Sequence, residues 1–440
     1  MKVDYAYWDV ENNEFWEHTA KKIAWRTLTI TTIALFFSFT TWYLMSALVV
    51  KLPCVGFTFT REQLYWLTAL TGLAGGTFRI IHTFLLPIVG TRNLITFSSI
   101  IKIIPLIGIG IAVMNPDTPF WVFVVLSLLL GLGGGDFSSF MPSTSVFFPQ
   151  RLKGTALGIQ AGLTNLGISV VQLITPFIIM FPILGGGQWC AEVNNPESNR
   201  GTEVFLQNAA FIYVPFLLVI AWVAWKYLRT VPVQASFRQQ LDIFSNKHTY
   251  ICTLLYLVTF GTFAGLSAVF PLLIKTLFGN FENAPDPLAY AFYIPLIGSL
   301  TRVIFGFIAD RVGGFTLTTI SCLGIALTLG TIIGFGLLNP SSAADFTWFI
   351  IAFFIILFFT GIGNAGTFKQ FPQIFLHNPR QGAGVIGWTA AIAAYGPFIF
   401  GVLISFSLKN TNSVVPFFIG LSIFALVGAI INFWFYQRKR

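Results

Sequence analysis

The chain has 440 residues, of which 55% are hydrophobic and only 9% are charged. An ordinary soluble domain carries roughly 25% charged residues, so this composition excludes a single water-soluble core and favours helices that face lipid. The net charge of +9 could indicate a nucleic-acid-binding protein, but the Lys and Arg residues are spread over short loops instead of forming one basic patch, and we expect no nucleic-acid partner.

Apolar stretches long enough to cross a hydrocarbon core of ~30 Å recur along the whole chain. After a charged segment, six stretches lie at about 28–50, 63–89, 94–114, 119–147, 154–184 and 205–228. Six more follow at about 249–275, 287–309, 315–338, 347–375, 383–408 and 413–436. We therefore predict an all-α membrane protein with twelve transmembrane helices in two halves. Its parts are a cytoplasmic N-terminal segment (1–27), an N-terminal six-helix half (28–228), a cytoplasmic linker (229–248) and a C-terminal six-helix half (249–440).

The loop charges predict the orientation. Lys and Arg concentrate in the loops that share a side with the linker and both termini, whereas the opposite side carries Lys51, Arg61, Arg200, Lys275 and Lys409. Because basic loops stay in the cytoplasm, both termini are predicted to be cytoplasmic. We expect a multi-pass protein of the bacterial cytoplasmic (inner) membrane. Its helices would contact the lipid bilayer, and it would function as a monomer.

The four cysteines divide into two pairs. Cys252 and Cys322 lie in predicted helices, and Cys54 and Cys190 lie in predicted outer loops. A Cys54–Cys190 disulfide could form in an oxidising periplasm, but free cysteines are common core residues and we favour free thiols. The sequence has no His/Cys spacing of a metal site, no catalytic triad and no phosphate-binding loop, so we expect neither a metal, a cofactor nor an enzyme.

Short segments of the two predicted halves align with each other in order, as internal repeats of transporters do. Residues 75–79 (GGTFR) align with 298–302 (GSLTR), so that Arg79 corresponds to Arg302. The other aligned positions are Gly131, Gly133, Pro142 and Pro149 with Gly361, Gly363, Pro372 and Pro379, and Gly158 and Gly167 with Gly387 and Gly396.

Two resemblances follow from these motifs. Residues 306–314 (GFIADRVGG) resemble the G-x-x-x-D-R-x-G-G loop motif of the major facilitator superfamily, with Gly306, Asp310, Arg311 and Gly313 at its positions. Nearly the whole chain resembles the nitrate/nitrite porter family of that superfamily, through FSSFM at 137–141, GTALGIQAGLTNLG at 154–167, LYLVTFG at 255–261 and GIGNAGTF at 361–368. The second nitrate signature, GVIGWTAAIAAYG at 384–396, is degraded, and Ala394 stands at the position that matches Asn165.

The resemblance implies a binding site. Arg79 and Arg302 would bind the anion, Phe137 and Phe260 would sandwich it, and Asn165 and Tyr256 would offer polar contacts. Small residues allow helices to pack closely and to rock against one another, and we expect that role for the motif glycines Gly162, Gly167, Gly363 and Gly366.

The chemistry of the two arginines supports this site. Arg79 and Arg302 lie about 17 and 15 residues from the outer ends of their helices, hence roughly 22–26 Å inward at 1.5 Å per residue. A cation there costs at least ~2.5–3.5 kcal/mol, so it should face the bundle interior and meet an anion. Two guanidinium groups suit a small planar oxyanion, because each can donate two parallel hydrogen bonds. The alternative is that each arginine snorkels or pairs with an acid, and Asp136 is the one acid well inside a predicted helix.

Four further polar residues in the predicted helices have more than one interpretation. Asp136 could pair with Lys102, which lies at a similar depth, and we favour this pairing. Alternatively, Asp136 could be a counterion to Arg79 or could carry a proton. His82, one turn from Arg79, is better explained by packing than by a proton relay. Lys369 could attract the anion or contact a lipid headgroup.

These observations predict a secondary transporter that moves nitrate and nitrite by alternating access, exchanging one for the other. Repulsion between two buried arginines would hinder the empty carrier, and a bound anion would relieve it. Proton-coupled nitrate import through Asp136 is the alternative, as is a major facilitator for another small anion. A channel or sensor is less favoured because no segment is long enough to form a sensory domain.

Overall fold

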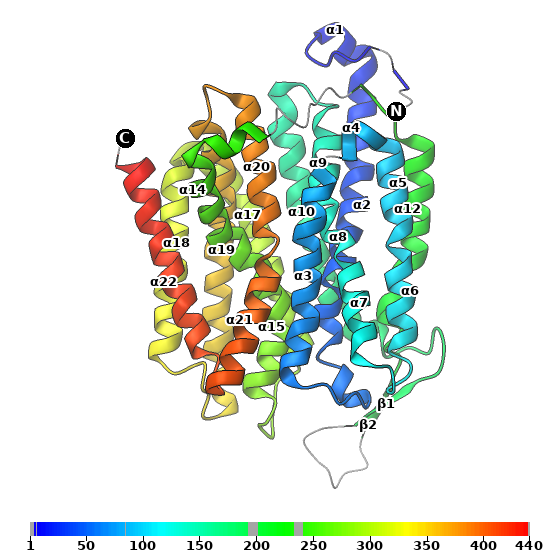
Figure 1. Cartoon of the computed structure of the whole chain (residues 1–440), viewed down its shortest axis with the longest axis vertical. Helices are drawn as coiled ribbons and strands as arrows, with labels where there is room; N and C mark the ends of the chain where they lie inside the picture. Colours follow the sequence, from blue (N-terminus) through cyan, green and yellow to red (C-terminus); the bar gives the residue numbers. More distant parts are fainter. Residues whose placement is uncertain (1–3, 6, 84, 192–200, 233–240, 439–440) are drawn as a thin grey trace.

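The computed structural model describes residues 4–5, 7–83, 85–191, 201–232 and 241–438, and the described chain is a bundle of long helices (Figure 1). The first half consists of α1 (Asn13–Phe15), α2 (Lys21–Leu48), α3 (Arg61–Thr83), α4 (Leu85–Val89), α5 (Thr91–Ile101), α6 (Ile103–Ala112), α7 (Phe120–Leu130), α8 (Leu132–Gly135), α9 (Phe137–Ser145), α10 (Gln150–Ile178), α11 (Asn208–Phe211) and α12 (Tyr213–Tyr227). The second half consists of α14 (Lys247–Tyr256), α15 (Thr262–Phe278), α16 (Pro287–Ala291), α17 (Tyr293–Val312), α18 (Gly314–Gly334), α19 (Phe346–Ile374), α20 (Pro379–Ala393), α21 (Gly396–Thr411) and α22 (Val415–Asn432).

Eleven helical segments of the described chain are long and apolar enough to cross a membrane. The twelfth crossing is α3, whose 23 residues span about 34 Å at 1.5 Å per residue. It is less apolar than the others because it contains Arg61, Glu62 and Arg79. The first helical segment begins at Asn13, well before the apolar stretch at 28. A Glu17–Lys21 pair one turn apart, 2.7 Å between Oε2 and Nζ, supports this polar extension.

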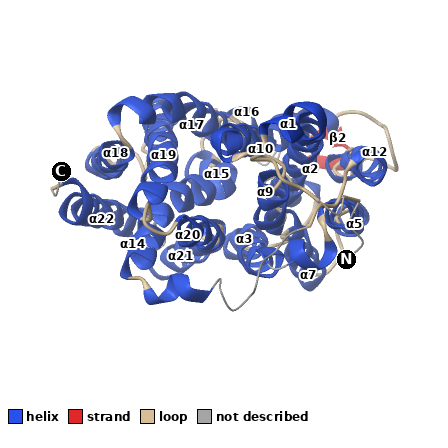
Figure 2. Ribbon diagram, turned by 90° about the horizontal axis from the view of Figure 1, so that it is seen from above, coloured by secondary structure: helices blue, strands red, loops and turns tan. Residues whose placement is uncertain are grey.

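The two halves lie side by side, and α2 begins at the same end of the bundle at which α22 finishes (Figures 1 and 2). Contacts between the halves run along α3 with α21 and along α10 with α17. Hydrogen bonds across this interface gather toward the end opposite the termini, where Tyr43 donates to the Ala264 carbonyl at 3.1 Å. Gln172 donates to the Ser267 carbonyl at 2.8 Å. The halves are therefore held together most firmly at the end away from the termini.

Three glycines toward the terminal end have free space beside them. A Cβ placed on Gly158 of α10 or on Gly387 of α20 would meet no neighbouring atom within 4 Å. Gly306, close to the end of α17, is equally open. These three positions come from the aligned helices and the loop motif of the two halves, and each has room for an added methyl group.

The connection between α10 and α11 forms a two-stranded hairpin that the sequence did not predict. Strands β1 (Gln188–Ala191) and β2 (Gly201–Val204) are antiparallel. Cys190 of β1 forms a disulfide with Cys54, although 136 residues separate them. Our expectation of free thiols at these two positions is therefore wrong, because folding brings together two loops that no local pattern relates. Cys252 and Cys322 are free and buried.

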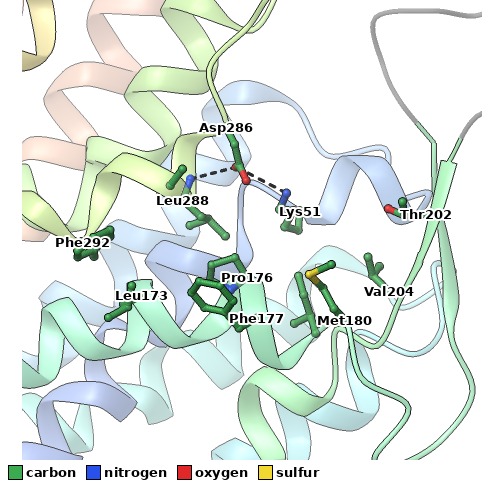
Figure 3. A pocket seen from close by; sticks show the side chains of 12 residues that line it. Lys51, Leu173, Pro176, Phe177, Met180, Thr202, Val204, Asp286, Leu288 and Phe292 are labelled. Atoms are coloured by element: carbon green, nitrogen blue, oxygen red, sulfur yellow. Dashed lines mark hydrogen bonds and ion pairs between the residues drawn. The ribbon is translucent and has the colours of Figure 1, made fainter. Parts of the chain in front are cut away.

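A pocket of about 440 Å³ lies beside this hairpin, between the end of α10 and the start of α16 (Figure 3). Phe177 and Met180 line it on one side, and Asp286 and Lys51 lie together at another edge with 3.7 Å between Oδ1 and Nζ. Asp286 also caps α16 by accepting the Leu288 N–H. The pocket contains none of the predicted anion ligands, and its ion pair joins the two halves at the end opposite the termini.

Candidate anion-binding site

Arg79 of α3 is fully buried, and its guanidinium group is held by backbone carbonyls from both halves. Its Nε donates to the Gly134 carbonyl of α8 at 2.9 Å. Its Nη1 donates to the Ala390 carbonyl of α20 at 2.6 Å. Its Nη2 is buried without a hydrogen-bond partner. Two of its three nitrogens therefore fix the direction in which the third is offered.

Arg302 of α17 occupies the corresponding position of the second half. Its side chain is 7% exposed, and both Nη1 and Nη2 are buried without a hydrogen-bond partner. Its Cζ lies 4.6 Å from the centre of the Phe368 ring. The phenol of Tyr256 lies near both guanidinium groups. Three arginine nitrogens in one region are thus buried without acceptors.

Aromatic rings connect the two arginines. The Cζ of Arg79 lies 4.7 Å from the Phe137 ring centre and 5.7 Å from that of Phe260. Phe260 stacks on Tyr256 at 5.2 Å, with 6° between the ring planes. Both residues lie at a π-helical turn, Leu257–Gly261, a kind of local distortion that is frequent at functional sites. The two rings expected to sandwich an anion therefore flank the guanidinium group of Arg79.

Tyr256 is also fully buried, and its phenol approaches hydrogen-bonding distance of the Arg302 side chain and interacts electrostatically with both arginines. It contacts Phe368 at 5.3 Å between ring centres. Tyr256 and Phe368 thus continue the aromatic wall from Phe260 to the side of Arg302.

Two asparagines add further unpaired polar atoms. Asn165 of α10 is 1% exposed, and neither its Nδ2 nor its Oδ1 has a hydrogen-bond partner. Gly162, one turn earlier, packs against Val303, which places this part of α10 beside Arg302. Asn364 of α19 is fully buried with both amide atoms unpartnered as well. Buried polar atoms are normally hydrogen-bonded, so such a set indicates a ligand or water between them.

The site carries excess positive charge. Among the described residues, no ion pair joins Arg79 or Arg302 to an acid. Asp136, the candidate counterion, instead pairs with Lys102, and both side chains are fully buried. The arrangement therefore leaves two guanidinium groups for an anion to neutralise.

Of the remaining predicted residues, two lie near this centre and the loop-motif residues lie at the end of α17. His82 is largely buried, with 2.9 Å between its Nδ1 and the Ser139 Oγ. Lys369 is half-buried in α19, next to Phe368. The structure describes Arg311 as exposed and gives Gly313 a φ of +90° after α17, whereas the side chain of Asp310 lies outside the described residues.

Sequence reasoning did not select Asn364, Trp42 or Phe39 as parts of the site. The rings of Trp42 and Phe39 lie 5.3 and 5.9 Å from the Cζ of Arg79. Asn364 stands inside a glycine-rich motif, and a polar residue in an apolar helix was the signal that could have found it. Nothing distinguishes the two aromatic residues in a chain with 49 Phe and 12 Trp.

Comparison with known proteins decides the family. The model of the Major Facilitator Superfamily matches residues 29–388. Over 432 residues, the chain is 52% identical to the probable nitrate/nitrite antiporter NarK2 of Thermus thermophilus, covering 98% of this chain and 96% of that protein. The chain belongs to the nitrate/nitrite porter family of the major facilitator superfamily.

Two more distant relatives also match nearly the whole length of the chain. The nitrate/nitrite transporter NarU of Escherichia coli (strain K12) is 36% identical to this porter, over 98% of the chain and 96% of that protein. The nitrite extrusion protein of Bacillus subtilis (strain 168) is 23% identical, over 94% and 95%. The porter is accordingly a multi-pass membrane transporter with the all-α, two-half architecture expected from its sequence.

The motif glycines of the porter lie at close helix contacts. A Cβ on Gly167 would come within 2.4 Å of the Phe36 carbonyl oxygen, and one on Gly363 within 2.2 Å of the Ser321 Oγ. Gly366 packs against Thr318 in the same way. A larger side chain would collide with the neighbouring helix at these positions. At Gly162, where α10 meets α17, an added Cβ would come within 2.8 Å of the Val303 side chain.

Proposed function

We propose that this porter exchanges nitrate and nitrite across the bacterial cytoplasmic membrane, binding the anion between Arg79 and Arg302. The observation that carries the proposal is that Arg79 Nη2 and Arg302 Nη1 and Nη2 are buried without acceptors. A small planar oxyanion would supply acceptor oxygens to them and place its negative charge between two cations. The names of the two most similar relatives above, a nitrate/nitrite antiporter and a nitrate/nitrite transporter, support the choice of anion.

The same geometry favours exchange. Without an anion the two guanidinium groups repel each other, which opposes the closing of the halves around an empty site. A bound anion cancels that repulsion, so the loaded carrier changes its conformation more readily than the empty one. A carrier that changes conformation mainly when an anion is bound must bind a second anion before it can return to its first conformation, and the result is exchange.

Orientation completes the proposal. With both termini in the cytoplasm, as the loop charges predict, the firmly held end of the bundle faces the periplasm. We place the Lys51–Asp286 pair in the periplasmic gate, which must separate before the site can open outward.

Counterflow in proteoliposomes tests the exchange. Vesicles loaded with nitrite should take up external nitrate at least ten times faster than empty vesicles, with or without a pH gradient. Nitrite and chlorate should compete with nitrate, whereas sulfate, a more strongly hydrated dianion, should not. Uptake that needs a pH gradient and ignores internal nitrite would make the porter a proton-coupled importer.

The importer is the second candidate because Asp136 lies close to a second titratable group. Its Oδ1 is 3.6 Å from the Nδ1 of His82. Against it, the carboxylate of Asp136 is already neutralised by Lys102 and receives a hydrogen bond from Ser38 at 2.6 Å. An acid so fully paired is a poor carrier of a transported proton, so we favour exchange.

A further inference from the structure

Behind the anion site, the first half contains a buried ion pair in a shell of hydroxyl groups. Lys102 and Asp136 are both fully buried and in direct contact. Ser38 of α2 donates to the Asp136 Oδ2 at 2.6 Å and accepts from the Lys102 Nζ at 2.9 Å. Ser98 of α5 donates to the Asp136 Oδ1. A carboxylate held by three groups from two other helices has little freedom to move.

Asp136 lies where the chain needs such restraint. It separates α8 from α9, and the residues before it include Gly131, Gly133, Gly134 and Gly135. Glycine gives the backbone many accessible conformations, so a segment this rich in glycine is poorly defined by its own propensity. The backbone of Asp136 is itself helical, with φ −53° and ψ −29°, so its buried side chain anchors the junction between the two helical segments.

The anchored segment is the one that touches Arg79. The Gly134 carbonyl, two residues before Asp136, accepts the Arg79 Nε at 2.9 Å. The ring of Phe137, the residue after Asp136, lies 4.7 Å from the Arg79 Cζ. A third connection runs through Ser139, whose Oγ donates to the Asp136 carbonyl at 3.2 Å and meets His82, three residues beyond Arg79.

The second half provides an internal comparison. In the repeat alignment, Asp136 corresponds to Gly366 and Gly134 to Asn364, so this half has no carboxylate at that point. Here α19 runs without interruption from Phe346 to Ile374. In this half the terminal nitrogens of Arg302 bind no backbone carbonyl and have the Tyr256 phenol nearby, whereas Nε and Nη1 of Arg79 donate to carbonyls. The half with the ion pair is the half whose arginine is held in a defined direction.

We propose that the Lys102–Asp136 pair is a positioning device for anion binding. It holds residues 134–137 so that the Gly134 carbonyl and the Phe137 ring direct the free nitrogen of Arg79 toward the anion. The inference rests on the proposed function. Neither Lys102 nor Asp136 contacts the anion in it, and the pair acts through Arg79.

The test removes both charges together, in the variant K102M/D136N. Removing one charge would leave the other buried without compensation, whereas a neutral pair of similar size is commonly tolerated. We expect folded protein whose nitrate KM in proteoliposome uptake rises at least tenfold, while the rate at saturating nitrate stays within threefold of the wild type. The matched control is E17Q/K21M, which neutralises an exposed Lys–Glu pair on the same half and should leave KM unchanged.

A second variant covers the case in which the neutral pair does not fold. S38A removes one hydrogen bond to Asp136 and keeps both charges, and it should raise the nitrate KM at least threefold. An unchanged KM in either folded variant overturns the positioning role. Loss of pH-driven uptake with an unchanged nitrate KM would also overturn it and would make the cluster a proton site. If the wild type transports no nitrate, the proposed function fails with it, whereas an unchanged KM in a variant of a working wild type overturns the positioning role alone.

Discussion

Replacing Arg79 by Lys separates a bidentate anion site from a position that needs only a positive charge. The guanidinium group of Arg79 does three things at once: Nε and Nη1 bind the carbonyls of Gly134 and Ala390, and Nη2 is left for the anion. A lysine has one nitrogen at the end of a flexible chain, so it cannot reach both carbonyls and also the anion. R79K therefore loses either the contact to the anion or the two carbonyl contacts that orient the side chain toward the anion.

The size of the loss follows from the hydrogen bond that disappears. A hydrogen bond to a charged group contributes about 1.5–3 kcal/mol. At ~1.4 kcal/mol per tenfold change, one lost bond lowers nitrate affinity by about 10- to 150-fold. R79K also loses the bond to Ala390 across the two halves, so we expect the upper part of this range.

The assay is nitrate binding by purified protein together with initial uptake rates in proteoliposomes. R92K is the matched control, because Arg92 lies outside the site and pairs with Asp4 at 3.1 Å, a contact that a lysine can also make. R92K should bind nitrate as the wild type does. A folded R79K protein whose nitrate affinity stays within twofold of the wild type would refute the placement of the anion at Arg79.

Three further predictions test other parts of the structure. N364A should raise the nitrate KM about 5- to 20-fold without lowering thermal stability, since both amide atoms of Asn364 are unpartnered. The control N432A should lower thermal stability without changing the nitrate KM, because the Asn432 Nδ2 donates to the Phe315 carbonyl at 2.8 Å. The variant C54S/C190S should lose about 2–4 kcal/mol of stability, measured as a lower melting temperature. It should keep the wild-type nitrate KM, because the disulfide lies in loops away from the anion site. Reduction of the wild-type protein should lower the melting temperature by the same amount. G133A should yield little folded protein in size-exclusion chromatography, because its Cβ would lie 2.2 Å from the Ser38 carbonyl oxygen, whereas G420A has open space around it and should fold normally.

The sequence by itself predicted the membrane architecture, and it selected most of the residues that the structure brings together at the candidate site. Hydropathy and loop charge are sums over neighbouring residues, so they can be read without knowing which helices touch. Arg79 and Arg302 could be singled out for a similar reason, because a cation deep in an apolar helix is costly wherever that helix packs. Their aligned positions in the two halves then placed them at one depth.

Only the tertiary structure decided which groups meet. The sequence left Lys102, Arg79 and a proton as candidates for Asp136, and packing of α5 against the α8–α9 interruption places Lys102 there. Packing also brings Cys54 to Cys190 and leaves Arg302 without the carbonyl partners of Arg79. Such contacts join residues far apart in the chain, and their geometry depends on ångström-scale distances between helices. Neither spacing nor composition encodes those distances, which is why a repeat that looks symmetric in sequence holds its two arginines differently.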